Sequence, residues 1–243
     1  MKNLLTQGKK PTIAAILFKE DTGSVLYTRL KQEMAAGLGI GYEVFSFSMG
    51  DDIESIVQQV HSLNTNPAIT GIIIQKPWRN AWIAFQNLPA EEGKARFSAW
   101  WQRLIESIEP TKDVDGLHLS TLEAIRDGSW KEQGKVLPAT CRSVVALLEE
   151  AFQTENLFEY LRDHTLKTII LGKSDLLGQP LFALLQSNNL EVEMIGSSEL
   201  NQRIEQKKFL HDADIIVSAT GRKKLIAAEL VKEGAVIIDA GEP

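Results

Sequence analysis

The sequence has one cysteine, Cys141, among 243 residues. A single cysteine excludes an internal disulfide and a cysteine-rich zinc site, and it suits a reducing compartment. The sequence also lacks a run of about 18 apolar residues and the long apolar stretch of a secretory signal. We therefore expect a cytoplasmic protein with no membrane-spanning segment and no membrane partner.

An excess of basic charge is also missing. Lys and Arg number 26 against 32 Asp and Glu, which gives a net charge of −6. Because neutralising phosphates requires a basic surface, this balance argues against a nucleic-acid partner. The remaining composition, with 44% hydrophobic and 24% charged residues, is that of an ordinary globular protein. The length corresponds to one large domain or two small ones.

Short apolar runs alternate with helical patterns along the whole sequence. Such runs are typical of parallel strands covered on both faces, and the strand–helix–strand rhythm predicts right-handed crossovers in an α/β fold. The predicted strands are residues 12–18, 43–48, 71–75, 168–172, 191–195, 214–219 and 235–239. The predicted helices include residues 24–38, 53–63 and 142–161.

The alternation predicts two α/β domains, residues 1–137 and 138–243. Gly134 and Pro138 interrupt the pattern between them, as residues in linkers often do. We expect the helix at 142–161 to bridge the two domains, and we expect a parallel sheet in the second.

Four of the five tryptophans fall in the segment from about residue 78 to 105, which we interpret as an insertion. They are Trp78, Trp82, Trp100 and Trp101. The favoured interpretation is a pair of helices that buries its own aromatic side chains. The alternative is a lid or a partner surface, because aromatic residues are enriched in the cores of interfaces.

The segment from Gly172 to Pro180 follows a predicted strand and opens a helical pattern. A glycine turn at this position lets the backbone approach a ligand, and the following helix N-terminus favours an anion, to which Lys173 adds a positive charge. The segment lacks the G-x-G-x-x-G fingerprint, so a plain strand–helix turn stays open as the alternative. Small residues also end the strands before residues 221 and 241, where an open α/β sheet forms its ligand crevice.

Tyr27 and Lys31 are four residues apart on a predicted helix, so a phenol and an amine share one face. A lysine moves protons near neutral pH when its surroundings lower its pKa, but the spacing alone favours a solvated surface pair. Gln75 ends an apolar strand, where its amide either faces a crevice or caps the sheet. Asp113 and Asp115 favour a turn or a ligand-binding carboxylate, because too few oxygen ligands are evident for a metal.

Taken in order, these segments resemble the bifunctional methylenetetrahydrofolate dehydrogenase/cyclohydrolase family. Residues 24–31 are similar to its S-x-x-Y-V-x-x-K segment, residues 71–77 to G-[IL]-[LI]-V-Q-L-P, and residues 112–118 to K-D-V-D-G-[FL]-H. Residues 137–140, 172–180, 212–221 and 232–241 resemble its linker, its G-R-S-x-x-V-G-x-P loop and two later motifs. Each motif is weak alone, but their common order covers nearly the whole chain.

The resemblance implies two α/β domains with a cleft between them, the second of them Rossmann-like. It implies tetrahydrofolate derivatives as substrates on the first domain and NADP, or NAD, on the second, with no metal. The implied reactions oxidise 5,10-methylenetetrahydrofolate to the methenyl form and hydrolyse that form to 10-formyltetrahydrofolate, in the one-carbon metabolism that feeds purine biosynthesis. The resemblance also implies a homodimer.

The resemblance assigns catalytic roles to four residues. Lys31 assists proton movement in ring opening, Tyr27 bounds the folate, Gln75 orients Lys31, and Asp115 bonds the amino-substituted edge of the pterin. The implied substrate-binding residues are Tyr27, Lys31, Ile74, Gln75, Lys76 and Asp115. The implied cofactor-binding residues are Gly172, Lys173, Ser174, Ser197 and Glu242.

Three features depart from the family pattern. Lys173 replaces an arginine, which keeps the charge but loses the bidentate fork. Lys76 replaces an apolar residue, and we hypothesise that its amine favours a neutral Lys31 if both face the cleft. The sequence stops at Pro243, where the family continues with a further loop and helix, so we expect a truncated or degenerate chain. The alternatives are therefore an impaired relative that acts as a binding or dimer-forming module, and an NAD(P)-dependent dehydrogenase with another substrate.

Overall fold

A computed structural model describes residues 10–220 and 225–241. By its contacts the chain divides into two compact units, Met1–Leu119 and Ser120–Pro243. The domain boundary between residues 137 and 138 stays a prediction. Within the described ranges, every helix is too short or too polar to cross a membrane.

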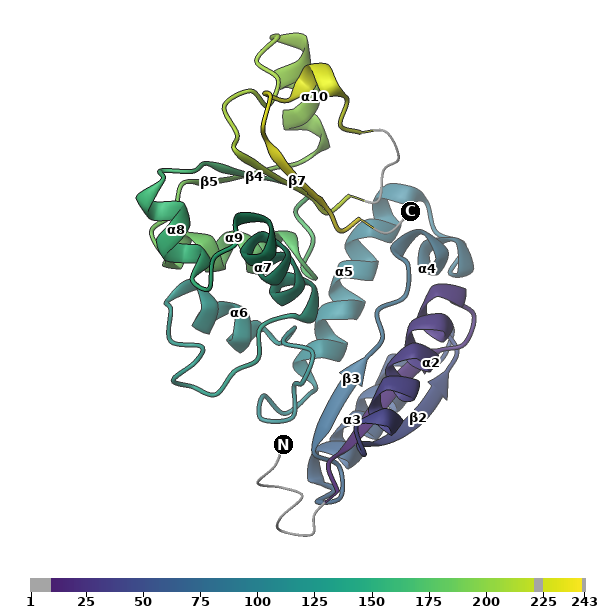
Figure 1. The fold of residues 1–243 in the computed structure, drawn as a ribbon. Helices are drawn as coiled ribbons and strands as arrows, with labels where there is room; N and C mark the ends of the chain where they lie inside the picture. Colours follow the sequence, from purple (N-terminus) through teal and green to yellow (C-terminus); the bar gives the residue numbers. More distant parts are fainter. Residues whose placement is uncertain (1–9, 221–224, 242–243) are drawn as a thin grey trace. The chain divides into compact units, whose positions relative to one another are not determined.

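The first unit is built on a three-stranded parallel sheet in the order β2-β1-β3. The two edge strands, β2 and β3, are labelled in Figure 1. The central strand is β1 (Thr12–Phe18), flanked by β2 (Gly41–Phe47) and β3 (Gly71–Ile74). The chain adds β2 at one edge and then crosses to the other edge for β3. The carboxyl ends of β1 and β3 therefore meet where the strand order reverses, which is where open α/β sheets bind ligands.

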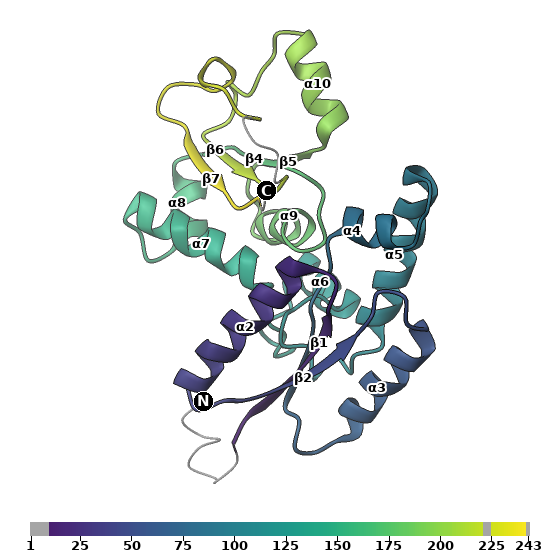
Figure 2. The same ribbon diagram turned by 90° about the vertical axis from the view of Figure 1, so that its right-hand side faces the viewer.

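Helices cover both faces of this sheet (Figure 2). One face carries α2 (Thr22–Gly37), and the other carries α3 (Ile53–Thr65) and α5 (Ala90–Glu106). Alternation along the central strand sends Ile16 and Phe18 to the side of α3 and α5, where the main core lies. Ile13, Ala15 and Leu17 of the central strand alternate to the other face, under α2.

The tryptophan-rich segment forms two helices, α4 (Arg79–Phe85) and α5, as the favoured interpretation predicted. Trp82, Phe97 and Trp101 are each at most 5% exposed, and they pack in one core with Phe18. The rings of Trp82 and Phe97 meet edge to face with centroids 5.5 Å apart, a favourable geometry for aromatic pairs. These side chains thus join the core of the unit instead of forming a separate one.

The second unit contains a four-stranded parallel sheet in the order β5-β4-β6-β7, which confirms the predicted α/β class. Its strands are β4 (Thr168–Leu171), β5 (Val192–Ile195), β6 (Ile215–Ser218) and β7 (Val236–Asp239). Its helices are α6 (Leu119–Arg126), α7 (Ala139–Phe152), α8 (Leu157–Asp163), α9 (Gly178–Ser187), α10 (Ser197–Glu205) and the short η1 (Ala228–Leu230). The strand order again reverses beside the first strand, β4, as in nucleotide-binding sheets. Each predicted strand in both units is present, with its ends within two residues of the prediction.

The predicted helix at residues 142–161 is wrong, because two helices, α7 and α8, occupy this region. Gln153 ends α7 in a left-handed conformation with φ of 52°, and the Asn156 side chain begins α8 by accepting a bond from the Glu159 amide. The predicted bridge is also corrected, because buried Leu148 and Leu161 place both helices in the core of the second unit.

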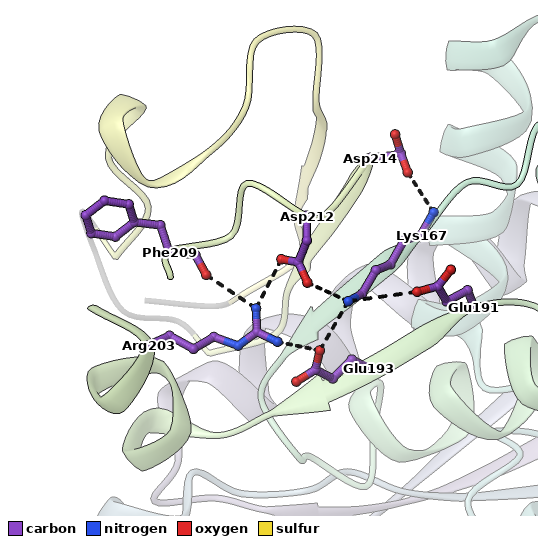
Figure 3. Close-up of polar contacts among 7 residues, drawn as sticks. All are labelled: Lys167, Glu191, Glu193, Arg203, Phe209, Asp212 and Asp214. Carbon is purple, nitrogen blue, oxygen red and sulfur yellow. Dashed lines mark hydrogen bonds and ion pairs between the residues drawn. The ribbon is translucent and has the colours of Figure 1, made fainter. Parts of the chain in front are cut away.

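A network of charges lies at the amino-terminal edge of the second sheet (Figure 3). Lys167 contacts Asp212, and its Nζ lies 3.6 Å from Glu193 and 3.9 Å from Glu191. Arg203 from α10 contacts Glu193 and lies 3.2 Å from Asp212. The contact with Asp212 and the other carboxylates outweighs partial burial and raises the pKa of Lys167. For Asp212, burial raises the pKa, but the two cations outweigh it and the net shift is downward. Lys167 and Asp212 therefore stabilise each other's charged forms.

Candidate functional site

The helix α2 turns small and polar side chains, not leucines, toward the sheet. Ser24, Thr28 and Ala35 are its buried residues. Asp21 begins the helix as its N-cap, with the carboxylate accepting a 2.8 Å bond from the Ser24 amide. A helix face of this kind leaves room for polar groups between the helix and the sheet.

Three predicted residues meet at this face. The Nζ of Lys31, on α2, lies 3.2 Å from Oε1 of Gln75, which directly follows β3. The same nitrogen lies 3.7 Å from Oδ2 of Asp115. The Lys31 side chain is 34% exposed and that of Asp115 is 23% exposed, so solvent and a ligand can reach both. The structure thus brings Lys31, Gln75 and Asp115 together.

The two carboxylates of the 112–118 motif have different surroundings. Asp113 is 7% exposed and accepts bonds of 2.9 Å from the amides of Gly116 and His118, so it holds the turn in shape. Asp115 faces Lys31 instead. Burial raises the pKa of Asp115, Lys31 opposes the rise, Asp113 adds to it, and the net shift is upward. The amine and the carboxylate of raised pKa can bind and release protons, and the Gln75 amide holds the amine in place.

The loop that carries Gln75 is fixed from two sides. The backbone amide of Gln75 donates a 2.9 Å hydrogen bond to the Ile16 carbonyl. The Ser24 hydroxyl donates a 3.3 Å hydrogen bond to the Lys76 carbonyl. The Lys76 ammonium lies over the ring of Trp101, 5.0 Å from its centroid, which is within cation–π range. The structure thus places Lys76 against α5, whereas the partners of Lys31 are Gln75 and Asp115.

The remaining predicted residues of the first unit are placed differently. Tyr27 lies one turn before Lys31 on α2 and is 39% exposed. Ile74 is 1% exposed and packs in the core on the side of α3 and α5. Its side chain is therefore turned away from the face on which Lys31 lies.

Tyr42 belongs to this site and was not predicted. Tyr42 lies on β2 beside Ile13, on the sheet face under α2. Its hydroxyl is buried and has no hydrogen-bond partner among the residues that the structure describes. Burial and the charge of Asp115 together raise the pKa of Tyr42 to about 12, so the phenol stays protonated. The alternation that sends Phe45 and Phe47 to the core was a signal that Tyr42 faces the other way.

In the second unit, the loop after β4 is a tight turn built on two glycines. Gly172 has φ of +111°, and a Cβ there would lie 3.0 Å from the Ala219 carbonyl oxygen. A Cβ on Gly178 would lie 2.2 Å from the Gly172 carbonyl oxygen. Ser174 closes the turn, since its hydroxyl accepts from the Gly178 amide at 3.2 Å. Both positions therefore require glycine because the backbone packs against itself there, and dinucleotide-binding turns use glycines for tight turns of this kind.

The predicted cofactor residues Lys173 and Ser197 follow two neighbouring strands, β4 and β5. Lys173 donates a short bond to the carboxylate of Glu199, in the first turn of α10. Glu199 was not predicted, because its partner Lys173 is 26 residues away in the sequence. Glu242 lies outside the described residues.

Two other predictions concern metals and the cysteine. In residues 10–220 and 225–241, no group of three or more His, Cys, Asp or Glu side chains is placed to hold a metal ion. Cys141 is fully buried, and burial raises the pKa of its thiol to about 12. A protonated, inaccessible thiol has a packing role.

Two protein-family profiles match the chain. Residues 1–91 match the catalytic domain of tetrahydrofolate dehydrogenase/cyclohydrolase, and residues 138–242 match the NAD(P)-binding domain of the same family. The matched residues make up most of the chain.

Individual relatives agree with the profiles. The bifunctional protein FolD 2 of Desulfitobacterium hafniense is 31% identical over 241 residues, which are 99% of this chain and 73% of that protein. The solved structure of the bifunctional enzyme FolD from Campylobacter jejuni superposes with a TM-score of 0.76 at 22% identity, over 99% of this chain and 74% of that one. The enzyme of Trypanosoma brucei was solved with NADP cofactor and an inhibitor. It superposes with a TM-score of 0.72 at 24% identity, over 99% of this chain and 71% of that one. These two structures share the two-domain α/β fold.

Proposed function

Because the chain belongs to the tetrahydrofolate dehydrogenase/cyclohydrolase family, we propose that it oxidises 5,10-methylenetetrahydrofolate and hydrolyses the resulting methenyl form to 10-formyltetrahydrofolate. The observation that carries this proposal is the contact of the Lys31 amine with both Gln75 and Asp115. Two of these residues, Lys31 and Gln75, lie in the segment that matches the catalytic-domain profile.

We assign the proton transfers to Lys31. When water adds to the methenyl carbon and the ring opens, a proton leaves the water and the ring nitrogen gains one. The Lys31 amine takes the proton from the water and gives it to the ring nitrogen. The 3.2 Å hydrogen bond to Gln75 holds the amine in place. The amine is within reach of both solvent and substrate, because its side chain is one third exposed.

Binding of the folate falls to the neighbouring side chains. Asp115 is the acceptor for the amino-substituted edge of the pterin, because a partly buried carboxylate forms strong bonds with such donors. Tyr27 bounds the ring from the same helix as Lys31. Lys76 is proposed to contact substrate from its position against Trp101, and Ile74 to support the loop from the core.

The second unit has the features that a dinucleotide requires. The glycine turn of Gly172 and Gly178 leaves no room for side chains, so it suits a main-chain contact with the cofactor. Lys173, Ser174 and Ser197 would hold the adenosine end of the cofactor. Glu242, from the resemblance, would lie on the nicotinamide side. When bound, the cofactor supplies the acceptor for the hydride that leaves the methylene bridge.

The test is turnover by the whole chain. Methylenetetrahydrofolate is mixed with the protein and either NAD⁺ or NADP⁺, and the absorbance of the reduced cofactor and the formation of 10-formyltetrahydrofolate are followed together. We expect both signals. A protein that binds a dinucleotide but forms neither product would be an impaired relative. Reduction of the cofactor only with another substrate would indicate a different dehydrogenase.

We also propose, from the family resemblance, a homodimer located in the cytoplasm and active in the one-carbon supply for purine biosynthesis. Light scattering of the purified protein tests the first point. A mass close to 27.0 kDa would identify a monomer, and twice that mass the dimer.

A further inference from the structure

A lysine and a glutamate lie at the carboxyl ends of β4 and β5, where a bound dinucleotide would place the ribose of its adenosine. These strands are neighbours, and the residues after them are Gly172–Ser174 and Ser197–Glu199. In doubly wound sheets, an acidic residue near the end of the second strand binds the ribose hydroxyls of NAD, and a basic residue accommodates the 2′-phosphate of NADP. This chain places one residue of each kind here.

Lys173 and Glu199 are paired with each other. The Lys173 ammonium donates to one carboxylate oxygen of Glu199. The other oxygen accepts bonds from the Gly196 amide at 3.1 Å and from the Ser198 hydroxyl at 2.8 Å. The side chains are 47% and 41% exposed, so a ligand can reach the pair. The carboxylate thus takes up the donors that would otherwise receive a phosphate.

The backbone at Gly196 is shaped to this arrangement. A Cβ on Gly196 would lie 2.9 Å from Oε2 of Glu199 and 3.5 Å from Cε of Lys173. Glycine therefore lets the carboxylate close over the amide of Gly196, the N-cap of α10. The bond from Lys173 lowers the pKa of Glu199 to about 2, so the carboxylate is ionised at neutral pH.

The net charge of the pair sets its ligand. Lys173 alone would offer one positive charge at a helix N-terminus, which attracts a phosphate. With Glu199 ionised, the pair is neutral, and a 2′-phosphate would have to bind beside a carboxylate. A ribose with free 2′ and 3′ hydroxyls carries no charge, and its O–H groups are donors for that carboxylate.

We infer that this chain prefers NAD⁺ to NADP⁺ and that Glu199 is the residue that sets the preference. The inference rests on the proposed dehydrogenase function, because it assumes that the second unit binds a dinucleotide. It assigns Lys173 to holding Glu199 in place instead of binding the 2′-phosphate.

The experiment measures equilibrium binding by titration calorimetry, so that it does not depend on turnover. Wild type, Glu199→Gln and Glu205→Gln are each titrated with NAD⁺ and NADP⁺, and then with AMP and adenosine 2′,5′-bisphosphate. Glu205→Gln is the matched control, because it removes one exposed carboxylate from the same helix. Thermal unfolding shows whether each variant is folded.

We expect wild type to bind NAD⁺ at least about tenfold more tightly than NADP⁺, and AMP more tightly than the bisphosphate. Glu199→Gln should bind NADP⁺ about tenfold more tightly than wild type and NAD⁺ a few-fold more weakly, the size of one charged contact. Glu205→Gln should match wild type.

Tighter binding of NADP⁺ than NAD⁺ by wild type, or an unchanged ratio in folded Glu199→Gln, would overturn the inference and leave the proposed function intact. Failure of every dinucleotide and fragment to bind would overturn both.

Discussion

Two lysine–carboxylate clusters in this molecule have opposite electrostatic balances. In the first unit, Lys31 lies 3.7 Å from Asp115, and burial raises the pKa of that carboxyl despite the lysine. In the second unit, Lys167 and Arg203 share the carboxylates of Glu193 and Asp212, and the pKa of Asp212 is lowered. For Asp115, burial outweighs the contact with the lysine, whereas for Asp212 the two cations outweigh burial.

The difference separates groups placed for chemistry from groups placed for stability. A carboxylate that is desolvated without full compensation is destabilising, and proteins keep such groups where they act on ligands. A network in which each cation contacts two or more anions stabilises the fold and leaves no group free to react. The positions of the two clusters agree with this division. Gln75 follows the carboxyl end of β3, where open α/β sheets bind ligands, and Lys167 precedes the amino end of β4.

The largest expected effect comes from Lys31→Met, which keeps the side-chain stem and removes the amine. Ring opening should fall by about a hundredfold or more, since positioned acid–base groups contribute roughly that much. The affinity for the dinucleotide should not change. The measurements are the hydrolysis rate of methenyltetrahydrofolate and the binding constant of the cofactor.

Arg29→Met is the matched control for Lys31→Met. It removes a cation from the same helix, but one whose side chain is 67% exposed and paired with Glu33. Equal rates for the two variants would place Lys31 among the surface cations and remove the contrast between the clusters.

Lys167→Met should act on stability and not on turnover. Its side chain is 20% exposed, so its ion pairs are neither fully exposed nor fully buried. We therefore expect a loss of about 1–2 kcal/mol in the free energy of unfolding, between the energies of exposed and buried ion pairs. Urea denaturation measures it. Activity per folded molecule should equal that of wild type, and a selective loss of activity would contradict the structural role.

The pH dependence of this loss has a definite sign. The pKa of Asp212 is lowered in the folded state, so its stabilising effect is present above the ordinary carboxyl pKa and disappears as the pH falls through the lowered value. The penalty for Lys167→Met should therefore shrink in acid. A penalty that stayed constant from pH 7 to about pH 3 would exclude an electrostatic origin.

Asp115→Asn should raise stability, whereas Lys167→Met should lower it. The folded-state pKa of Asp115 is raised, so wild type loses stability as the pH rises from the ordinary carboxyl pKa through the raised one. The amide has no charge to desolvate, so the variant should be more stable at pH 8 by on the order of 1 kcal/mol. The gain should narrow as the pH falls toward about 4, near the ordinary carboxyl pKa. Urea denaturation at both pH values tests this, and a less stable variant at pH 8 would show that the contact with Lys31 dominates.

The sequence was sufficient for the parts of this comparison that depend on local pattern. The strands were predicted from apolar runs, or from alternation in the case of residues 43–48, and Lys31, Gln75 and Asp115 were predicted from ordered motifs. The break between α7 and α8 was not, because Gln153 adopts its left-handed conformation without a glycine or proline to mark it. Glu199 was missed for another reason, since its partner is 26 residues away and only the pairing of β4 with β5 brings them together.

Tyr42 was missed although the alternation along β2 turns it away from the core, and it offers the smallest predicted effect. Its hydroxyl is buried without a hydrogen-bond partner among the described residues, and such a group destabilises a fold. Tyr42→Phe removes only that oxygen, so the variant should be more stable than wild type by about 0.5–1 kcal/mol. If the hydroxyl serves the folate instead, the variant should also bind folate more weakly while its affinity for the dinucleotide stays the same. A less stable Tyr42→Phe would mean that the hydroxyl already has a partner in solution, and Tyr42 would then belong with the stabilising groups and not beside Asp115.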